Sequence, residues 1–310
     1  MNKIAIVVHG GAGPDSDYIK KNIEGYKKGL EEAVNTAYTI LEEGGHALDA
    51  VEAAVNYLED NPLFNAGKGS ALNENAEVEM DASIMNGQDR KCGAVAIVRH
   101  VKNPVTLARA VMEKTKHIYL GDMGALEFAR QIHIEMRPDS YFVTEHNYET
   151  FEEAAKEEQR DPKEAAETQL RRKEHGTVGA VALDKNGNLA AATSTGGIEN
   201  KKASRIGDSS IIGIGSYADN KVCAVSTTGD GEVLMEHITA FHIAALIEYK
   251  VLSVNDACHF LIHEKCKDVE GDMGVIAIDP KGNVALEFNS ERMHRSWRTS
   301  DQPVQVAIYK

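Results

Sequence analysis

Two segments far apart in the chain share one strand–turn–strand pattern, and this shared pattern restricts the possible folds more than any other feature. Residues 179–191 read GAVALDKNGNLAA, and residues 274–286 read GVIAIDPKGNVAL. In both, a turn rich in Asp, Gly and Asn separates two apolar runs, which indicates an antiparallel hairpin. A solenoid would need more copies of the unit. The pattern predicts an α+β fold rather than a doubly wound parallel sheet.

The other elements are predicted from apolar spacing and turn residues. Strands are expected at residues 3–9, 93–98, 221–226 and 304–309, and helices at 18–43, 46–59, 104–114, 122–131, 233–249 and 254–266. The first strand should end at Gly10-Gly11-Ala12-Gly13, a turn whose N–H groups could bind an anion. Residues 61–87 are rich in Gly and Asn and lack periodicity, which predicts a long irregular segment of functional importance.

Composition excludes several classes of protein. The 310 residues are 42% hydrophobic and 26% charged, which suits a large buried core and excludes disorder. With 34 Lys and Arg against 48 Asp and Glu, the net charge is −14, so nucleic-acid binding is not expected. Four cysteines are too few for a disulfide framework, and the apolar run at 4–8 is too short for a signal or membrane segment. We expect a cytoplasmic protein that binds no membrane.

The junction at Gly176 and Thr177 is the sharpest change of texture in the chain. Residues 149–174 are almost all charged or small, which predicts a solvated helix or a linker. An apolar strand begins directly at Thr177. Two other β runs, TSTGG at 193–197 and TTGDG at 227–231, also end in hydroxyl groups followed by flexible backbone. Such segments can supply the nucleophile and the oxyanion hole of acyl transfer, although Thr is common in strands and Gly in turns.

Two further motifs are better explained by ordinary structure. Residues 213–218 (GIGSYA) match a dinucleotide-binding pattern, but a strand rather than a helix is expected after them. His259 and His263 are spaced to share a metal on one helix, with Cys258 and Cys266 close in sequence. The two thiols are rotated well apart, so we interpret this segment as partly buried thiols and surface histidines.

Five ordered segments carry a resemblance to a known family. They are VVHGGAG (7–13), NPLFNAGKGSALNENAEVEMDASIMNG (61–87), HGTVGAVALDKNGNLAAATSTGG (175–197), RIGDSSIIG (205–213) and TTGDGE (227–232). Together they resemble the isoaspartyl peptidase and plant-type (type III) L-asparaginase family of N-terminal nucleophile hydrolases. The resemblance implies a four-layer αββα sandwich, formed by residues 1–310 as a single domain.

The resemblance also implies that the chain cuts itself between Gly176 and Thr177. The products are an α subunit, residues 1–176 with the charged linker 149–176 at its end, and a β subunit, residues 177–310. Cleavage frees an α-amino group whose ordinary pKa is about 7.7–8, so it can serve as a base near neutral pH. The implied assembly is an (αβ)2 heterotetramer.

The resemblance assigns the chemistry to three threonines. Thr177 attacks the side-chain amide of L-asparagine or the isopeptide carbonyl of a β-aspartyl dipeptide. Thr195 hydrogen-bonds to the Thr177 hydroxyl, and Thr228 forms the oxyanion hole with the Gly229 N–H. The free end of the substrate is implied to bind Arg205 through its carboxylate and Asp208 through its ammonium group.

The same resemblance supplies the remaining ligands. Gly231 is implied to contact the substrate ammonium and Asn65 to lie near the nucleophile. No catalytic cofactor is implied. A structural sodium ion is implied on backbone carbonyls of one loop, those of Leu58, Glu59, Asn61, Phe64, Ala66 and Lys68. Carbonyl oxygens suit a hard cation.

Three other functions stay open. Glycosylasparaginase belongs to the same superfamily but acts on sugar-linked asparagine, and the absence of N-x-[ST] sequons counts against a secreted enzyme of that kind. A threonine protease for protein substrates fits less well, because the RIGD segment implies capture of a free amino-acid end. The third alternative is an uncleaved, catalytically silent precursor or binding protein that keeps the fold.

Overall fold

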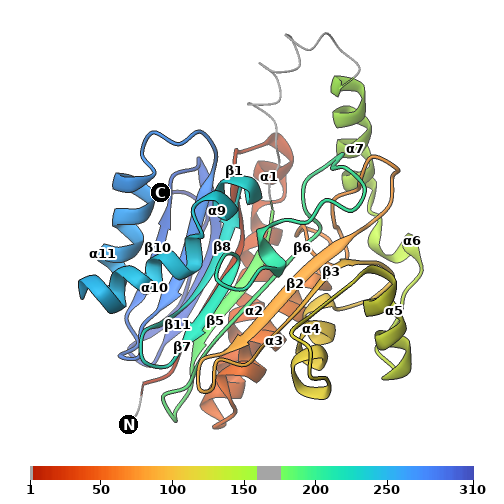
Figure 1. The fold of residues 1–310 in the computed structure, drawn as a ribbon. Coiled ribbons are helices and arrows are strands. Elements are labelled where there is room, and N and C mark those ends of the chain that lie inside the picture. Colours follow the sequence, from red (N-terminus) through yellow and green to blue (C-terminus); the bar gives the residue numbers. More distant parts are fainter. Residues whose placement is uncertain (1–2, 159–175) are drawn as a thin grey trace.

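The structure, a computed structural model, describes residues 3–158 and 176–310, and its described strands form two sheets (Figure 1). In spatial order the larger contains β12 (Gln302–Ala307), β11 (Arg292–Thr299), β1 (Ala5–Gly13), β5 (Val178–Leu183), β6 (Leu189–Thr195), β2 (Met80–Asn86), β3 (Cys92–Val98) and β4 (Tyr119–Gly121). The smaller contains β10 (Val284–Phe288), β9 (Met273–Ile278), β8 (Cys223–Gly229) and β7 (Ser216–Asp219). Only the pairing of β3 with β4 is parallel among these strands.

The described helices all lie between β1 and β9 along the chain. They are α1 (Asp17–Lys21), α2 (Ile23–Glu42), α3 (Ala47–Glu59), α4 (Pro104–Lys114), α5 (Asp122–Gln131), α6 (Asp139–Phe142), α7 (Glu145–Glu158), α9 (Gly231–Glu236), α10 (Thr239–Lys250) and α11 (Val254–His259), the last continued by a π-helix, Phe260–Lys265. Across residues 3–158 and 176–310, no helix is both long and apolar enough to cross a membrane.

Three apolar clusters hold the elements together. One joins α2, α3 and α4 to the large sheet and includes Leu30 and Val51. The second lies between the sheets, where Val181 of β5 and Ile276 of β9 belong to the same cluster. The third joins α10 and α11 to the small sheet. The sheets therefore pack face to face with helices on their outer faces, which confirms the predicted α+β class.

The two predicted hairpins are confirmed, and the same side-chain contacts close both turns. The Asp184 carboxylate accepts the N–H groups of Asn186 and Asn188 at 2.8 and 3.0 Å. The Asp279 carboxylate accepts the corresponding N–H groups of Lys281 and Asn283 at 2.8 and 2.9 Å. One hairpin belongs to each sheet, β5–β6 in the large and β9–β10 in the small.

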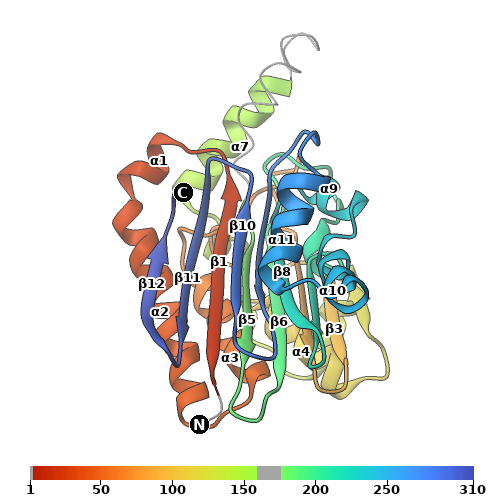
Figure 2. The same cartoon turned by 90° about the vertical axis from the view of Figure 1, so that its left-hand side faces the viewer.

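The predicted anion-binding turn at Gly10–Gly13 is wrong, because β1 continues through it to Gly13 and is buried along its whole length. Figure 2 shows β1 between β11 and β5. Its pairing with β11 shifts register between His9 and Ala12, as in a β-bulge. The glycines permit close packing: a Cβ on Gly10 would lie 2.3 Å from a ring carbon of Phe64.

Several other boundaries differ from the predictions. The helix expected at 18–43 is interrupted at Asn22, and the helix expected at 233–249 is interrupted at Ile238, whose φ is 49°. Strand β2 lies inside the segment expected to be irregular, and β11 was not predicted. The first part of the charged segment belongs to α7, which extends away from the body of the fold in Figure 1. Residues 159–175 of that prediction lie outside the described residues.

Candidate active site

Thr177 and Thr195 lie side by side because β5 and β6 are hairpin partners. Thr177 immediately precedes β5, and Thr195 ends β6. The Thr177 hydroxyl donates to Thr195 Oγ1 at 3.3 Å, and Thr195 Oγ1 donates to the Gly176 carbonyl oxygen at 3.1 Å. The Gly197 N–H donates to the same Thr195 oxygen at 2.9 Å. A buried chain of hydroxyl groups therefore ends on the carbonyl directly before Thr177.

Thr228 lies at the end of β8, on the sheet that faces β5. Its buried hydroxyl accepts the Ala12 N–H of β1 at 3.1 Å. The next residue, Gly229, has φ of 130°, and a Cβ there would lie 2.1 Å from the Asp272 carbonyl oxygen. The backbone at this point therefore requires glycine. Of the predicted oxyanion-hole residues, Thr228 is therefore hydrogen-bonded to β1, and Gly229 lies against the Asp272 carbonyl.

The His9 ring contacts the backbone of Thr177, a contact that the sequence did not predict. His9 Nδ1 lies 2.9 Å from the Thr177 carbonyl oxygen, and Nε2 lies 2.9 Å from Ser226 Oγ. Complete burial lowers the pKa of His9 to about 3, so the ring is neutral at neutral pH. Since a carbonyl can only accept, Nδ1–H donates to Thr177 and Nε2 accepts from the Ser226 hydroxyl. The one signal in the sequence is a histidine within an apolar strand.

A second group of predicted residues gathers around Arg205. Its guanidinium donates from Nε and Nη2 to both carboxylate oxygens of Glu232, a residue not predicted for the site. A Cβ added to Gly231 would lie 2.9 Å from Arg205 Nη2 and 3.1 Å from Asp208 Oδ1. Arg205, Asp208 and the Gly231 backbone, which the resemblance assigns to the free end of the substrate, therefore lie close together.

Asp208 is a buried carboxyl with an unusual proton affinity. Burial raises its pKa to about 7, opposed by the nearby Arg205 charge and by a hydrogen bond from Thr227 Oγ1 at 3.2 Å. Behind it, Asp81 of β2 accepts the N–H groups of Gly207 and Ile97 at 3.0 and 2.9 Å. Asp81 thereby anchors the loop that carries Arg205 and Asp208. Its role was not predicted because it depends on three segments meeting.

Asn65 fastens the loop beside the threonines. Its side chain donates to the Gly197 carbonyl at 2.6 Å and accepts the Ala71 N–H at 2.8 Å. A Cβ on Gly176 would lie 2.8 Å from the Asn65 Cβ. Asn65 is therefore close to the predicted cleavage point.

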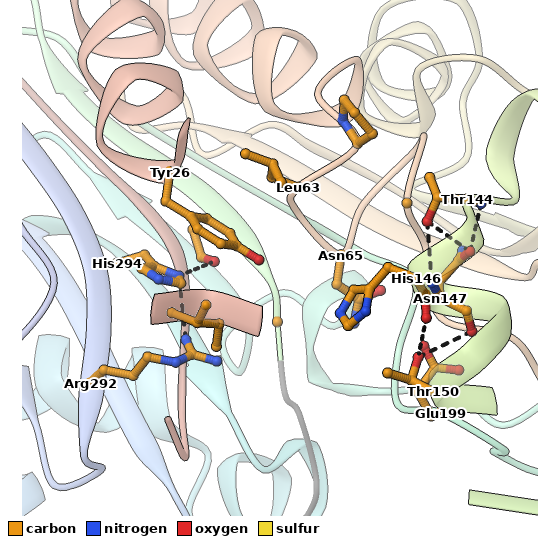
Figure 3. Close-up of a pocket in the computed structure, with 15 residues that line it drawn as sticks. Tyr26, Leu63, Asn65, Thr144, His146, Asn147, Thr150, Glu199, Arg292 and His294 are labelled. Carbon is orange, nitrogen blue, oxygen red and sulfur yellow. Dashed lines mark hydrogen bonds between the residues drawn. The ribbon is translucent and has the colours of Figure 1, made fainter. Parts of the chain in front are cut away.

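A cavity of about 60 Å³ opens beside Asn65 and Gly176 (Figure 3). Tyr26 and His294 lie at one end of the view, with their rings stacked at 4.4 Å. Asn147 lies at the other end and donates to the Ser70 carbonyl at 2.5 Å. The residues that line it lead from Gly176 toward α2 and α7, whereas Arg205 and Asp208 are not part of this lining.

The loop predicted to hold sodium is folded tightly on itself. The Lys68 N–H donates to the Glu59 carbonyl at 2.7 Å, and a Cβ on Gly67, whose φ is 56°, would lie 2.3 Å from that oxygen. The Asn61 and Phe64 carbonyls accept the N–H groups of Phe64 and Ala66, and the Leu58 carbonyl accepts those of Asp60 and Asn61. A carbonyl oxygen has two lone pairs, so the Asn61 and Phe64 carbonyls keep one lone pair each that could ligate a hard cation such as sodium.

The Glu59 side chain links this loop to the threonines. Its buried carboxylate accepts the Ser194 hydroxyl at 2.6 Å and the Val105 N–H at 3.1 Å. Burial raises its pKa to about 8, against these hydrogen bonds. Ser194 directly precedes Thr195, so a hydrogen bond connects Glu59 of this loop to β6.

The chain is similar to known proteins along almost its whole length. A sequence model of the family described as asparaginase matches residues 2–308. The chain is 43% identical to an isoaspartyl peptidase of Escherichia coli (strain K12), covering 100% of this chain and 97% of that protein. It is 45% identical to the isoaspartyl peptidase of Salmonella typhimurium over 100% of both chains. It is 45% identical to a human isoaspartyl peptidase/L-asparaginase, covering 94% of this chain and 92% of the human protein. The chain therefore belongs to the asparaginase family.

Proposed function

We propose that the chain is an autoproteolytically activated isoaspartyl peptidase/L-asparaginase with Thr177 as its nucleophile. The observation that carries this proposal is the hydroxyl chain from Thr177 through Thr195 to the Gly176 carbonyl. We assign residues 1–310 to a single domain, a four-layer αββα sandwich of the N-terminal nucleophile type. The packing of two sheets between helices supports the assignment.

In the precursor, the Thr177 hydroxyl attacks the Gly176 carbonyl carbon. The Thr195 hydroxyl, 3.1 Å from the carbonyl oxygen, stabilises the charge that develops there. The C–N bond breaks as the peptide nitrogen takes the hydroxyl proton, and water then hydrolyses the resulting ester. The products are the α subunit, residues 1–176, and the β subunit, residues 177–310.

In the mature enzyme, the freed α-amino group of Thr177 takes the proton from its own hydroxyl. The hydroxyl oxygen attacks the side-chain carbonyl of the substrate, and Thr228 with the Gly229 N–H stabilises the oxyanion. Ammonia or an amine leaves with the proton, and water hydrolyses the β-aspartyl ester to aspartate. His9 holds the Thr177 carbonyl at 2.9 Å, so the backbone of the nucleophile stays in place.

The charged cluster selects substrates with a free amino-acid end. The Arg205 guanidinium binds the α-carboxylate, and Asp208 with the Gly231 carbonyl binds the ammonium group. Asp208 binds an ammonium group best when it is ionised. Because burial raises its pKa to about 7, it is partly protonated near neutral pH, and an arriving cation lowers that pKa and so favours loss of the proton. Asn65 keeps the Gly196–Gly197 turn in place directly after Thr195.

The remaining assignments follow the family and complete the proposal. The substrates are L-asparagine and β-aspartyl dipeptides, and the reaction needs no catalytic cofactor. A sodium ion on the loop from Leu58 to Lys68 would fix the position of Glu59 and, through Ser194, of β6. We further propose an (αβ)2 heterotetramer in the cytoplasm.

Intact mass and substrate kinetics together test the proposal. The purified wild-type chain should yield two fragments in place of 33.8 kDa, whereas Thr177→Ala should stay whole and inactive. Thr177→Ser, which keeps a hydroxyl, is the matched control and should still cleave. An uncut wild-type chain would support a silent precursor or binding protein. A strong preference for glycosyl-asparagine over asparagine and β-aspartyl dipeptides would instead support a glycosylasparaginase.

A further inference from the structure

Three metal-ligating side chains converge on the outer face of the small sheet, far in sequence from the threonines. His263 Nε2 lies 2.9 Å from Glu287 Oε2, and His259 Nδ1 lies 3.8 Å from the same oxygen. The two imidazole rings are 4.9 Å apart. Ligand atoms of all three residues lie within 4.8 Å of one another. Both histidines therefore approach the same carboxylate oxygen of Glu287, although a simple ion pair needs only one histidine.

The backbone fixes this convergence. His259 ends α11, and His263 lies one turn further in the π-helix Phe260–Lys265. The opposite side of this helix is pinned by Cys258 and Leu261, which are completely buried in the cluster shared with the small sheet. A π-helical turn within a longer helix is often found at functional sites.

Glu287 comes from β10, the edge strand of the small sheet. Side chains alternate along a strand, so Glu287 shares a face with Ala285. Ala285 packs in the same apolar cluster as Cys258 and Leu261, so this is the face covered by α11 and the π-helix. The sequence alone could pair the two histidines but could not add this third ligand.

We propose that His259, His263 and Glu287 bind a divalent transition-metal ion of the zinc class and thereby fasten the π-helix to β10. Two imidazole nitrogens and one carboxylate oxygen are a common zinc ligand set, with a fourth position left for water. At zinc–ligand distances of about 2.0–2.2 Å, tetrahedral ligands lie roughly 3.3–3.5 Å apart. The two histidine–glutamate distances, 2.9 and 3.8 Å, bracket that separation, and all three ligand atoms lie within 4.8 Å of one another, so side-chain rotations would complete the site.

The surroundings leave the site open to solvent. The side chains of His259, His263 and Glu287 are 57%, 30% and 27% exposed. The Arg295 guanidinium interacts electrostatically with Glu287 but donates its own N–H groups to the carbonyls of Met293, Ile308 and Tyr309. The site shares no residue with the proposed sodium loop or the threonine cluster.

The test is calorimetric titration of the untagged, chelator-treated full-length protein with ZnCl2. We expect one zinc ion to bind the His259, His263 and Glu287 site of each chain, with a dissociation constant of about 1–100 μM. His259→Ala and His263→Ala should each weaken binding by roughly tenfold or more, and the double variant should abolish it. Glu287→Gln should weaken it as well. The matched control is His117→Ala, which removes an exposed histidine outside the cluster and should bind zinc as the wild type does.

Thermal melting gives a second readout that does not depend on activity. Zinc should raise the melting temperature of the wild type and of His117→Ala, but not that of the double variant, because bound metal stabilises only the folded state. The double variant should hydrolyse asparagine at the wild-type rate, which shows that it is folded. Absence of zinc binding by the wild type at about 1 mM, or unchanged binding by the double variant, would overturn the proposal.

Discussion

The Arg205 guanidinium and the Glu232 carboxylate form a two-point contact, at 2.9 Å from Nε and 2.7 Å from Nη2. This contact occupies one edge of the guanidinium and leaves the donors of Nη1 available to another carboxylate. Only 14% of the Arg205 side chain is exposed, whereas Glu232 is half exposed. We therefore expect Glu232 to act as a positioning residue for Arg205 rather than as a ligand for substrate.

We expect Glu232→Ala to raise KM for L-asparagine by about 3- to 10-fold, because Arg205 loses the group that orients its planar fork. The value of kcat should change little, since the reacting carbonyl is bound elsewhere. Glu232→Gln keeps one acceptor oxygen, so its KM should lie between those of the wild type and Glu232→Ala. Steady-state kinetics checks this, and an unchanged KM for Glu232→Ala would contradict the assignment.

Thr228→Ala tests the oxyanion hole. Removal of one such donor typically costs about 100- to 1,000-fold in kcat, with much less effect on substrate binding. Because the Thr228 hydroxyl also accepts the Ala12 N–H, Thr228→Ser serves as a control that keeps this hydrogen bond. A kcat for Thr228→Ala within a few-fold of the wild type would remove Thr228 from the proposed mechanism.

Thr195→Val should slow maturation as well as turnover. This change preserves shape but removes the hydroxyl that donates to the Gly176 carbonyl. Intact-mass spectrometry after expression should show the uncut chain accumulating, while Thr195→Ser should cleave close to normally. If Thr195→Val matured as quickly as the wild type, its hydroxyl would have no part in the cleavage.

Buried His9 predicts a stability loss in mild acid. Its pKa is lowered from 6.5 to about 3 by burial, so the folded state keeps the ring neutral while the unfolded state binds a proton below about pH 6.5. The free energy of unfolding should therefore fall as pH falls from about 6.5 toward 3, by at most about 1.4 kcal/mol per pH unit from this group.

The measurement compares melting temperatures at pH 7 and pH 5 in a Thr177→Ala background, where the chain is covalently whole. His9→Asn removes the titrating group and keeps a donor near the Thr177 carbonyl. Its melting temperature should change less between the two pH values than that of the parent. Equal pH dependence in both proteins would contradict the assigned cause.

Gly67→Ala tests the cation loop. The residue has φ of 56°, and its Cβ would lie 2.3 Å from the Glu59 carbonyl oxygen. We expect a loss of stability of about 1–3 kcal/mol. If sodium binds the carbonyls, the wild type should melt at a higher temperature in NaCl than in choline chloride, and Gly67→Ala should lose that difference. Identical melting of the wild type in both salts would argue against the ion.

Sequence reasoning was most successful where function depends on local order. The hairpin signal places Thr177 and Thr195 at one end of β5 and β6, and both hairpins were predicted from turn chemistry that the structure repeats. The family resemblance assigns Arg205 and Asp208 to one subsite, and the structure places both beside Gly231. Their chemical roles stay predictions.

What was missed depends on tertiary contacts. A run of glycines often marks a turn, but β1 continues through Gly10 because Ala12 and Gly13 pair with β11, and the Phe64 ring occupies the space beside Gly10. Asp81, Glu232 and Glu287 gain their roles from segments distant in sequence, and no local pattern marks them. Strand β11 carries many polar and charged residues, and its burial follows from pairing with β1.

The position of β1 in the large sheet determines what a cut at Gly176 could release. Strand β1 is hydrogen-bonded to β11 on one side and to β5 on the other, and both of those neighbours lie after the cut. The two fragments would therefore stay interleaved, and neither could leave without breaking the centre of the sheet. If the cut protein unfolded, its two fragments would have to meet again before they could refold, so renaturation should depend on protein concentration. The mature enzyme would therefore have folded as a single chain before the cut, and it could not refold by that single-chain route afterwards.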